Sequence, residues 1–269
     1  VVQSEHELVI PKDLPGDTIE LRLGLFHGEQ RLAPDQKHDD GDRRIRAGFL
    51  EVSGAAPRPL PRYTAPYMEK PPVLDGEASE AGWGAWTKSF EKTDGRGPAR
   101  QQARARLAWD SDHLYVAFDN DDPDLLARAE RRDDAVWRDD AHELYLAHAN
   151  DPGDYLELQV GVRGTIFDAS FHGGERRGID KGFTAALTAV TRHRGTINDA
   201  TDRDAGFGSE WAIAFDSLDK RPAAGDCWRM NLFNVGRDDG KSADESAWSP
   251  PLMGDFHNLS RLGELCFIR

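Results

Sequence analysis

The chain has 269 residues, of which 38% are hydrophobic and 30% are charged, a balance typical of a folded globular protein. Its formal net charge of −14 disfavours nucleic acid and anionic membrane surfaces as partners, because both are themselves negatively charged. No window holds the ~18 apolar residues of a membrane span, so no membrane insertion is expected. The acidity suits neutral sugars or a cation such as calcium.

Residues 1–54 form a β-rich N-terminal segment in our interpretation. Apolar and polar residues alternate over 18–26, and 7–10 and 45–52 are further short apolar runs. Three strands are too few to close a sandwich. We therefore expect either the end of an immunoglobulin-like domain or strands that pack on the main domain. Because no signal peptide opens the sequence, we expect that one was removed or that the chain is part of a larger protein.

A proline-rich stretch follows this segment. Residues 54–72 hold six prolines and show little periodicity. Prolines favour an extended and stiff backbone. The sequence therefore predicts a linker over 55–71, with the main domain occupying 72–269.

The main domain reads as one short strand after another, separated by turn residues. The predicted strands are 103–109, 113–118, 143–147, 155–161, 183–190, 210–215, 227–234 and 263–268. Many short strands without a long amphipathic helix are typical of an antiparallel β-sandwich. We predict an all-β fold of this kind.

An ordered series of motifs runs through the same region. In chain order they are VLDGE at 73–77, LAWDSDHLYVAF at 107–118, RDDAVWRDDAHELY at 132–145, YLELQV at 155–160, WAIAF at 211–215, WRMNL at 228–232, AWSPP at 247–251 and DFHN at 255–258. The series resembles the family 9 carbohydrate-binding modules, within the wider DOMON-like β-sandwich group. The resemblance implies a jelly-roll or immunoglobulin-like sandwich that binds carbohydrate without catalysis, in an extracellular or periplasmic protein.

The predicted sugar site has an aromatic and a polar part. A sugar ring presents an apolar face to aromatic side chains and a rim of hydroxyls to polar ones. The resemblance implies that Trp137, which lies among charged residues, is one wall of an aromatic clamp and that Phe256 is the other. The family's tryptophan at the second wall would be the stronger platform. The alternatives are a strand-end position for Trp137 and a core position for Phe256.

The polar rim departs from the family pattern at two positions. Glu143 matches a hydroxyl-binding carboxylate, and Asn258 completes the predicted set. Gln159 stands where the family can carry an arginine, and Phe233 where an amide side chain is expected. Glu143 could instead pair with a neighbouring arginine. Two substitutions leave open which sugar is bound, or whether the pocket is degenerate.

Calcium is a further expectation, because members of the resembled family often carry structural calcium. Asp75 and Glu77 supply the hard oxygen ligands that this ion prefers. The 12-residue spacing of an EF-hand loop is absent. The alternative is that such acidic runs are solvated turns.

The sequence leaves undecided some alternative functions and whether the two cysteines form a disulfide. Nucleophile, zinc-protease and phosphate-loop motifs are absent, so no enzyme is expected. A structural module with an emptied pocket is one alternative. Haem binding is another, since some DOMON-like relatives hold haem between methionine and histidine, here Met230 or Met253 with His257 or His142. The two cysteines, at positions 227 and 266, could form a disulfide or could be small buried side chains.

Overall fold

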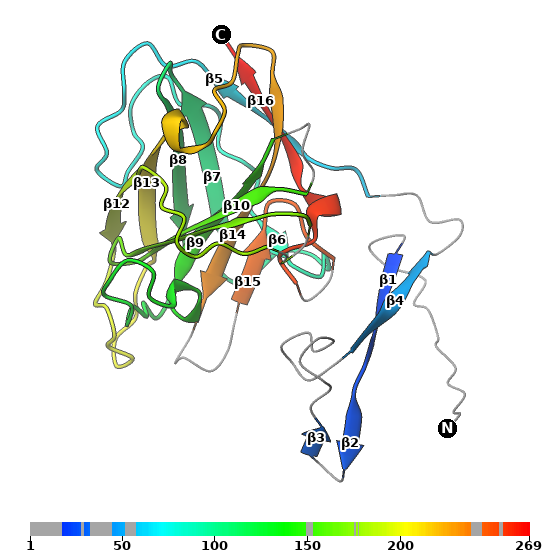
Figure 1. The fold of residues 1–269 in the computed structure, drawn as a ribbon. Coiled ribbons are helices and arrows are strands. Elements are labelled where there is room, and N and C mark those ends of the chain that lie inside the picture. Colours follow the sequence, from blue (N-terminus) through cyan, green and yellow to red (C-terminus); the bar gives the residue numbers. More distant parts are fainter. Residues whose placement is uncertain are drawn as a thin grey trace. The chain divides into compact units, whose positions relative to one another are not determined.

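A computed structural model describes residues 18–27, 30–32, 45–51, 58–148, 153–174, 176, 178–237, 244–252 and 255–269. Contacts divide the chain into two units, Val1–Pro59 and Leu60–Arg269 (Figure 1). No helix in the described ranges is long and apolar enough to cross a membrane.

The Val1–Pro59 unit contains two antiparallel strand pairs among its described residues. Strand β1 (Thr18–Leu23) pairs with β4 (Ile45–Glu51), and β2 (Leu25–His27) pairs with β3 (Gln30–Leu32). The strand predicted over 18–26 is therefore interrupted at Gly24. The predicted strand at 7–10 lies outside the described residues. The assignment of this unit to the end of an immunoglobulin-like domain stays a prediction.

The Leu60–Arg269 unit consists of two β-sheets. The larger sheet has the order β11-β10-β9-β14-β15-β6, with β16 paired to β14 and β5 paired to β16, and the smaller has the order β12-β13-β8-β7. The strands are β5 (Arg62–Pro66), β6 (Glu91–Lys92), β7 (Ala103–Trp109), β8 (His113–Asn120), β9 (Ala141–Ala147), β10 (Tyr155–Gly161), β11 (Ile166–Phe171), β12 (Leu187–His193), β13 (Phe207–Ala214), β14 (Cys227–Gly236), β15 (Asp244–Ala247) and β16 (Gly263–Ile268). The short 3₁₀ turns are η1 (Val136–Arg138), η2 (Phe215–Ser217) and η4 (Leu259–Arg261).

The main apolar core lies between the two sheets. Side chains alternate between the faces of a strand, so every second residue of the larger sheet points toward the smaller one. Leu144 of β9 and Leu158 of β10 are fully buried in this core with Leu107 of β7 and Val116 of β8. The prediction of an all-β sandwich is confirmed. The opposite face of the larger sheet also carries buried residues, and the candidate site lies there.

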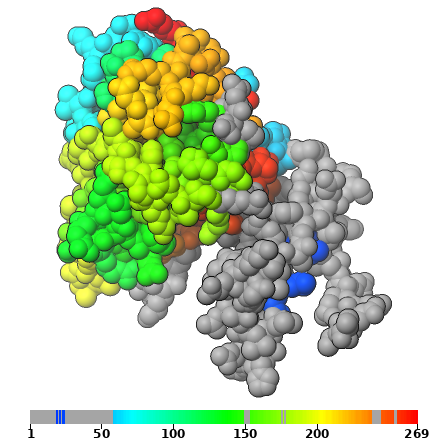
Figure 2. Space-filling model, viewed as in Figure 1, coloured from blue at the N-terminus to red at the C-terminus, as the bar shows by residue number. Residues whose placement is uncertain are grey.

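The predicted linker is partly wrong, because Arg62–Pro66 form strand β5 of the larger sheet. This strand runs parallel to β16, so the start and the end of the unit lie together (Figures 1 and 2). Tyr63 and Ala65 point into the core and are buried, which ties the strand to the domain. An edge strand tolerates a proline at its end, and Pro66 occupies that position.

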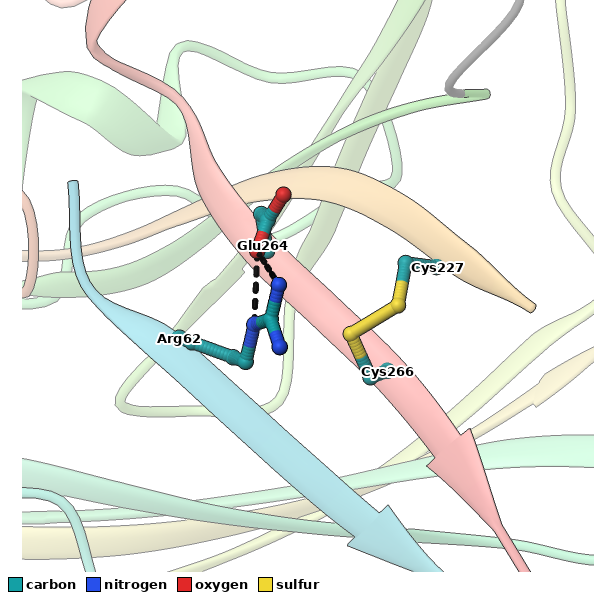
Figure 3. Close-up of a disulfide and its surroundings, with 4 residues drawn as sticks. All are labelled: Arg62, Cys227, Glu264 and Cys266. Carbon is teal, nitrogen blue, oxygen red and sulfur yellow. Dashed lines mark hydrogen bonds and ion pairs between the residues drawn. A yellow bond between two sulfur atoms is a disulfide. The ribbon is translucent and has the colours of Figure 1, made fainter. Parts of the chain in front are cut away.

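A disulfide joins the last strand to the centre of the larger sheet. Cys227 of β14 and Cys266 of β16 are directly opposite in the antiparallel register, with their Cα atoms 4.1 Å apart. On the other side of β16, Arg62 of β5 forms an ion pair with Glu264 at 2.6 Å (Figure 3). The structure thus settles the cysteine question in favour of the disulfide.

Candidate functional site

A cavity of about 580 Å³ lies on the face of the larger sheet that points away from the smaller sheet. Its floor comes from strands β9, β10, β11, β14 and β15, and its rim comes from η1 and from loops near residues 176–181 and 256. The lining residues are Trp137, Glu143, Tyr145, Glu157, Gln159, Phe167, Phe171, Arg176, Ile179, Lys181, Val235, Arg237, Glu245, Phe256 and His257.

Strand register places the floor residues in a row. Glu143 of β9 is opposite Gln159 of β10 on one side and opposite Phe233 of β14 on the other. Residues directly opposite each other in neighbouring strands share a face of the sheet. Three residues that are far apart in the sequence therefore meet in the middle of one surface.

Trp137 lies on turn η1 at the rim of the cavity. Val136, the preceding residue, is fully buried, while the indole of Trp137 is half-buried. The indole packs on Phe167 in an edge-to-face arrangement, with the ring centroids 5.0 Å apart and an angle of 71° between the planes. The guanidinium of Arg237 donates a hydrogen bond of 3.0 Å to the carbonyl of Trp137. The turn is thereby fixed against both β11 and the end of β14.

The charged residues beside Trp137 position its loop. Asp139 accepts hydrogen bonds from the backbone N–H groups of Arg128, at 2.5 Å, and Ala129, at 2.7 Å. Asp140 accepts one from Leu126 at 2.5 Å. These carboxylates are 3% and 0% exposed. The polar sequence around Trp137 therefore reflects loop anchoring.

Phe256 also lines the cavity and packs on a second phenylalanine. Its ring stacks on Phe233, with centroids 4.3 Å apart and planes within 4°. Phe233 is fully buried, so it supports Phe256 from below. The substitution of phenylalanine for the expected amide thus removes a polar group from the floor and adds a base for the aromatic wall.

The prediction for Asn258 is not supported by its position. Its side chain donates a hydrogen bond of 2.9 Å to the carbonyl of Pro251 and accepts one of 2.7 Å from Ser260. It does not belong to the cavity lining. Because both polar ends of the amide hold the loop together, Asn258 has a structural role.

Two polar side chains of the floor have unused hydrogen-bonding capacity. Glu143 is 2% exposed, and its carboxyl makes no hydrogen bond with the described residues. Burial, together with the negative charges of Glu157 and Glu245, raises the pKa of Glu143 well above its usual range. The Oε1 atom of Gln159 is buried and also lacks a hydrogen-bond partner among the described residues. Such groups destabilise a fold unless a ligand or water satisfies them.

Sequence reasoning did not assign Glu157 or His257 to the sugar site, although both line the cavity. Glu157 accepts a hydrogen bond of 2.6 Å from Gln159, and burial raises its pKa to about 7. His257 is hydrogen-bonded to Tyr155 at 2.5 Å and to Tyr145 at 3.3 Å, and burial lowers its pKa to about 4. The alternation of residues 155–159 places Glu157 on the same face as Gln159, so the signal was present in the sequence.

The two arginines that line the cavity are each paired with a carboxylate. Arg176 donates two hydrogen bonds, of 3.2 and 3.0 Å, to Asp255. Arg237 lies 2.9 Å from Glu245. These pairs neutralise the positive charges of the lining and fix its loops.

The predicted calcium ligands do not converge. Asp75 accepts a hydrogen bond of 2.9 Å from the backbone N–H of Glu77, while the carboxylate of Glu77 forms an ion pair with Arg192. In the described ranges no three His, Cys, Asp or Glu side chains gather as metal ligands. Since each carboxylate is engaged by the protein, these two residues as placed do not fit a calcium cage.

The candidate haem ligands are also occupied. The two ring nitrogens of His142 form hydrogen bonds of 2.8 and 3.1 Å with neighbouring serine and asparagine side chains. Met230 is fully buried in the core between the sheets, and both nitrogens of His257 face tyrosine hydroxyls. Met253 lies outside the described residues. The residues that are described therefore do not fit an iron-ligating pair.

Fold and cavity together define a β-sandwich module with a binding cavity on one sheet face. The family model for the carbohydrate family 9 binding domain-like proteins matches residues 74–268, so the chain belongs to that family. The resemblance drawn from the motifs is thereby confirmed.

Three solved structures share this fold. A putative carbohydrate-binding protein from Bacteroides uniformis is 15% identical with a TM-score of 0.61, covering 78% of this chain and 100% of its own. Two structures of a family 9 carbohydrate-binding module from Caldicellulosiruptor kristjanssonii are 20% identical. The complex with cellotriose has a TM-score of 0.54, and the match covers 77% of this chain and 94% of its own. The complex with glucose has a TM-score of 0.55, and the match covers 78% of this chain and 97% of its own. None of the curated proteins compared with the chain matches it.

Proposed function

We propose that the Leu60–Arg269 unit is a carbohydrate-binding module that holds a sugar in the cavity without catalysing a reaction. The observation that carries this proposal is that Trp137, Glu143, Gln159 and Phe256, which the sequence motifs assign to sugar binding, line one cavity. A cavity that combines aromatic surfaces with a few convergent polar groups is typical of small-molecule sites.

Each lining group has a role in the proposed complex. The rings of Trp137 and Phe256 pack against the C–H faces of the sugar, and burial of this apolar surface supplies affinity. Glu143 and Gln159 bind hydroxyls, which satisfies the polar atoms that the protein leaves without partners. The family membership and the glucose and cellotriose complexes of the Caldicellulosiruptor module support a sugar as the ligand.

We also propose that the module functions in an extracellular or periplasmic protein. The disulfide between Cys227 and Cys266 supports this location, because disulfides persist in oxidising compartments.

Isothermal titration calorimetry with a panel of mono- and disaccharides tests the proposal. Trp137→Ala should weaken binding by about 30-fold or more, since a buried tryptophan in a binding site contributes ~2 kcal/mol or more. Trp86→Ala is the matched control, because Trp86 is also half-buried but packs under Arg104 and Arg106 away from the cavity lining. Equal binding by wild type and Trp137→Ala, or no binding of any sugar, contradicts the proposal. Release of products from an oligosaccharide would contradict its non-catalytic part.

A further inference from the structure

Two buried carboxyl groups lie side by side on the cavity floor. Gln159 is directly opposite Glu143, and Glu157 is two residues along the same strand, so the two glutamates are diagonal neighbours on one face. Diagonal neighbours have Cβ atoms roughly 7–8 Å apart, which allows one small group to contact both carboxyls. Both residues line the cavity, and they are 2% and 8% exposed.

The protein supplies little positive charge for this pair. Arg237 is engaged by Glu245 and Arg176 by Asp255, each at 3.0 Å or less. His257 lies 3.9 Å from Glu157, but its lowered pKa keeps the ring uncharged near neutral pH. The remaining lining cation, Lys181, is an exposed residue. Burial raises the pKa of both carboxyls, to about 7 for Glu157, so near neutral pH the pair is only partly ionised. An ammonium group placed between the two carboxyls would favour their ionised forms.

From this charge balance, and resting on the proposed function, we propose that the cavity prefers a sugar with a protonated amine, whose ammonium group lies between Glu143 and Glu157. An ammonium group donates three hydrogen bonds, and charge-assisted hydrogen bonds are about twice as strong as neutral ones. A metal ion fits the pair less well, because no third His, Cys, Asp or Glu side chain joins it in the described ranges.

The test compares three sugars of the same ring on the full chain by calorimetry near neutral pH. Glucosamine carries the amine, glucose has a hydroxyl in its place, and N-acetylglucosamine has an uncharged amide. We expect glucosamine to bind about tenfold more tightly than either of the other two, as one charge-assisted hydrogen bond in a buried site allows. High salt should reduce this preference.

Variants then assign the preference to the carboxyl pair. Glu157→Gln should bring the glucosamine-to-glucose affinity ratio close to one, because it removes the ionisable carboxyl that the ammonium group would contact while keeping the shape. Glu264→Gln removes a carboxylate that pairs with Arg62 outside the cavity lining, and it should leave the ratio unchanged.

The outcomes separate this inference from the proposed function. If glucose binds and glucosamine binds no better, the amine preference is wrong while the sugar site stands. If the preference survives Glu157→Gln, the carboxyl pair does not produce it and the inference is wrong. If no sugar binds at all, both proposals fail.

Discussion

The two faces of strands β9 and β10 are equally buried but differ in chemistry. The face toward the smaller sheet carries apolar residues such as Leu144 and Leu158, which pack in the main core. The face toward the cavity carries Glu143 and Gln159, at 2% and 1% exposure. Burial alone therefore does not distinguish core from site.

The difference lies in whether the buried groups have partners in the protein. An apolar side chain is satisfied by packing, whereas a buried polar group without a hydrogen bond lowers stability. The carboxyl of Glu143 makes no hydrogen bond within the described part of the chain, and its pKa is raised. The hydrogen-bonding capacity of Glu143 is therefore available to a ligand in the cavity that it lines.

Neighbouring residues on β10 give the largest expected contrast. Leu158→Ala should reduce the free energy of unfolding by about 2–5 kcal/mol, because it leaves a cavity in a tightly packed core. Gln159→Ala should cost about 1 kcal/mol or less, since it removes one hydrogen bond and one unpartnered oxygen. Urea denaturation followed by tryptophan fluorescence measures both, because all seven tryptophans lie in the Leu60–Arg269 unit.

The two substitutions should affect sugar affinity in the opposite order, with the larger loss for Gln159→Ala. The folded Leu158→Ala protein should retain affinity close to wild type, and Gln159→Ala should lose several-fold. A Gln159→Ala protein that is as destabilised as Leu158→Ala would show that the cavity face is ordinary core.

The free energy of unfolding should depend on pH through Glu157, a buried carboxyl on the cavity face. Its pKa is raised by burial from its usual value of 4.5 to about 7 in the folded state, so the folded protein holds the proton more tightly than the unfolded chain. Its contribution to stability is therefore fully present below pH ~4.5 and is lost as pH rises to ~7. For the 2.5-unit difference, the loss is on the order of 3 kcal/mol.

The Glu157→Gln variant separates the contribution of the Glu157 carboxyl from those of other titrating groups. His257 and His142 have lowered pKa values, and their contributions change in the opposite direction as pH rises toward ~6.5. Glu157→Gln removes only the carboxyl, so the stability of the variant relative to wild type should increase from acid to neutral pH. A difference that stays constant across this range would mean that Glu157 ionises normally.

Strand periodicity predicted most of the sandwich, and the misses have physical causes. Strands β7 and β16 have the predicted bounds, since their patterns are bounded by turn residues. Strand β5 was not predicted because the prolines around it indicated a linker, whereas an edge strand tolerates proline. Strand β11 was missed because Asp168, a buried residue paired with Arg132, and Ser170 interrupt its apolar run.

The order of the sequence motifs predicted the aromatic and carboxyl residues of the site. It did not predict which charged side chains pair with each other there. Trp137 and Glu143 lie in one continuous motif, so the resemblance identified them together. The pairing of Arg176 with Asp255 joins residues 79 positions apart and depends on tertiary structure. The role of Phe233 likewise became clear only from its stacking beneath Phe256.

The stacked pair of Phe256 and Phe233 provides the smallest predicted change in sugar affinity. Phe256→Trp should tighten sugar binding by a few-fold, or about 0.5–1 kcal/mol, because an indole offers a larger face than a phenyl ring. The change places extra ring surface at the rim of a cavity of about 580 Å³, while Phe233 still supports it from below. Phe256→Ala is the matched control and should weaken binding. If calorimetry gives the same affinity for both variants, Phe256 is a packing residue, and the aromatic contact with the sugar comes from Trp137 alone.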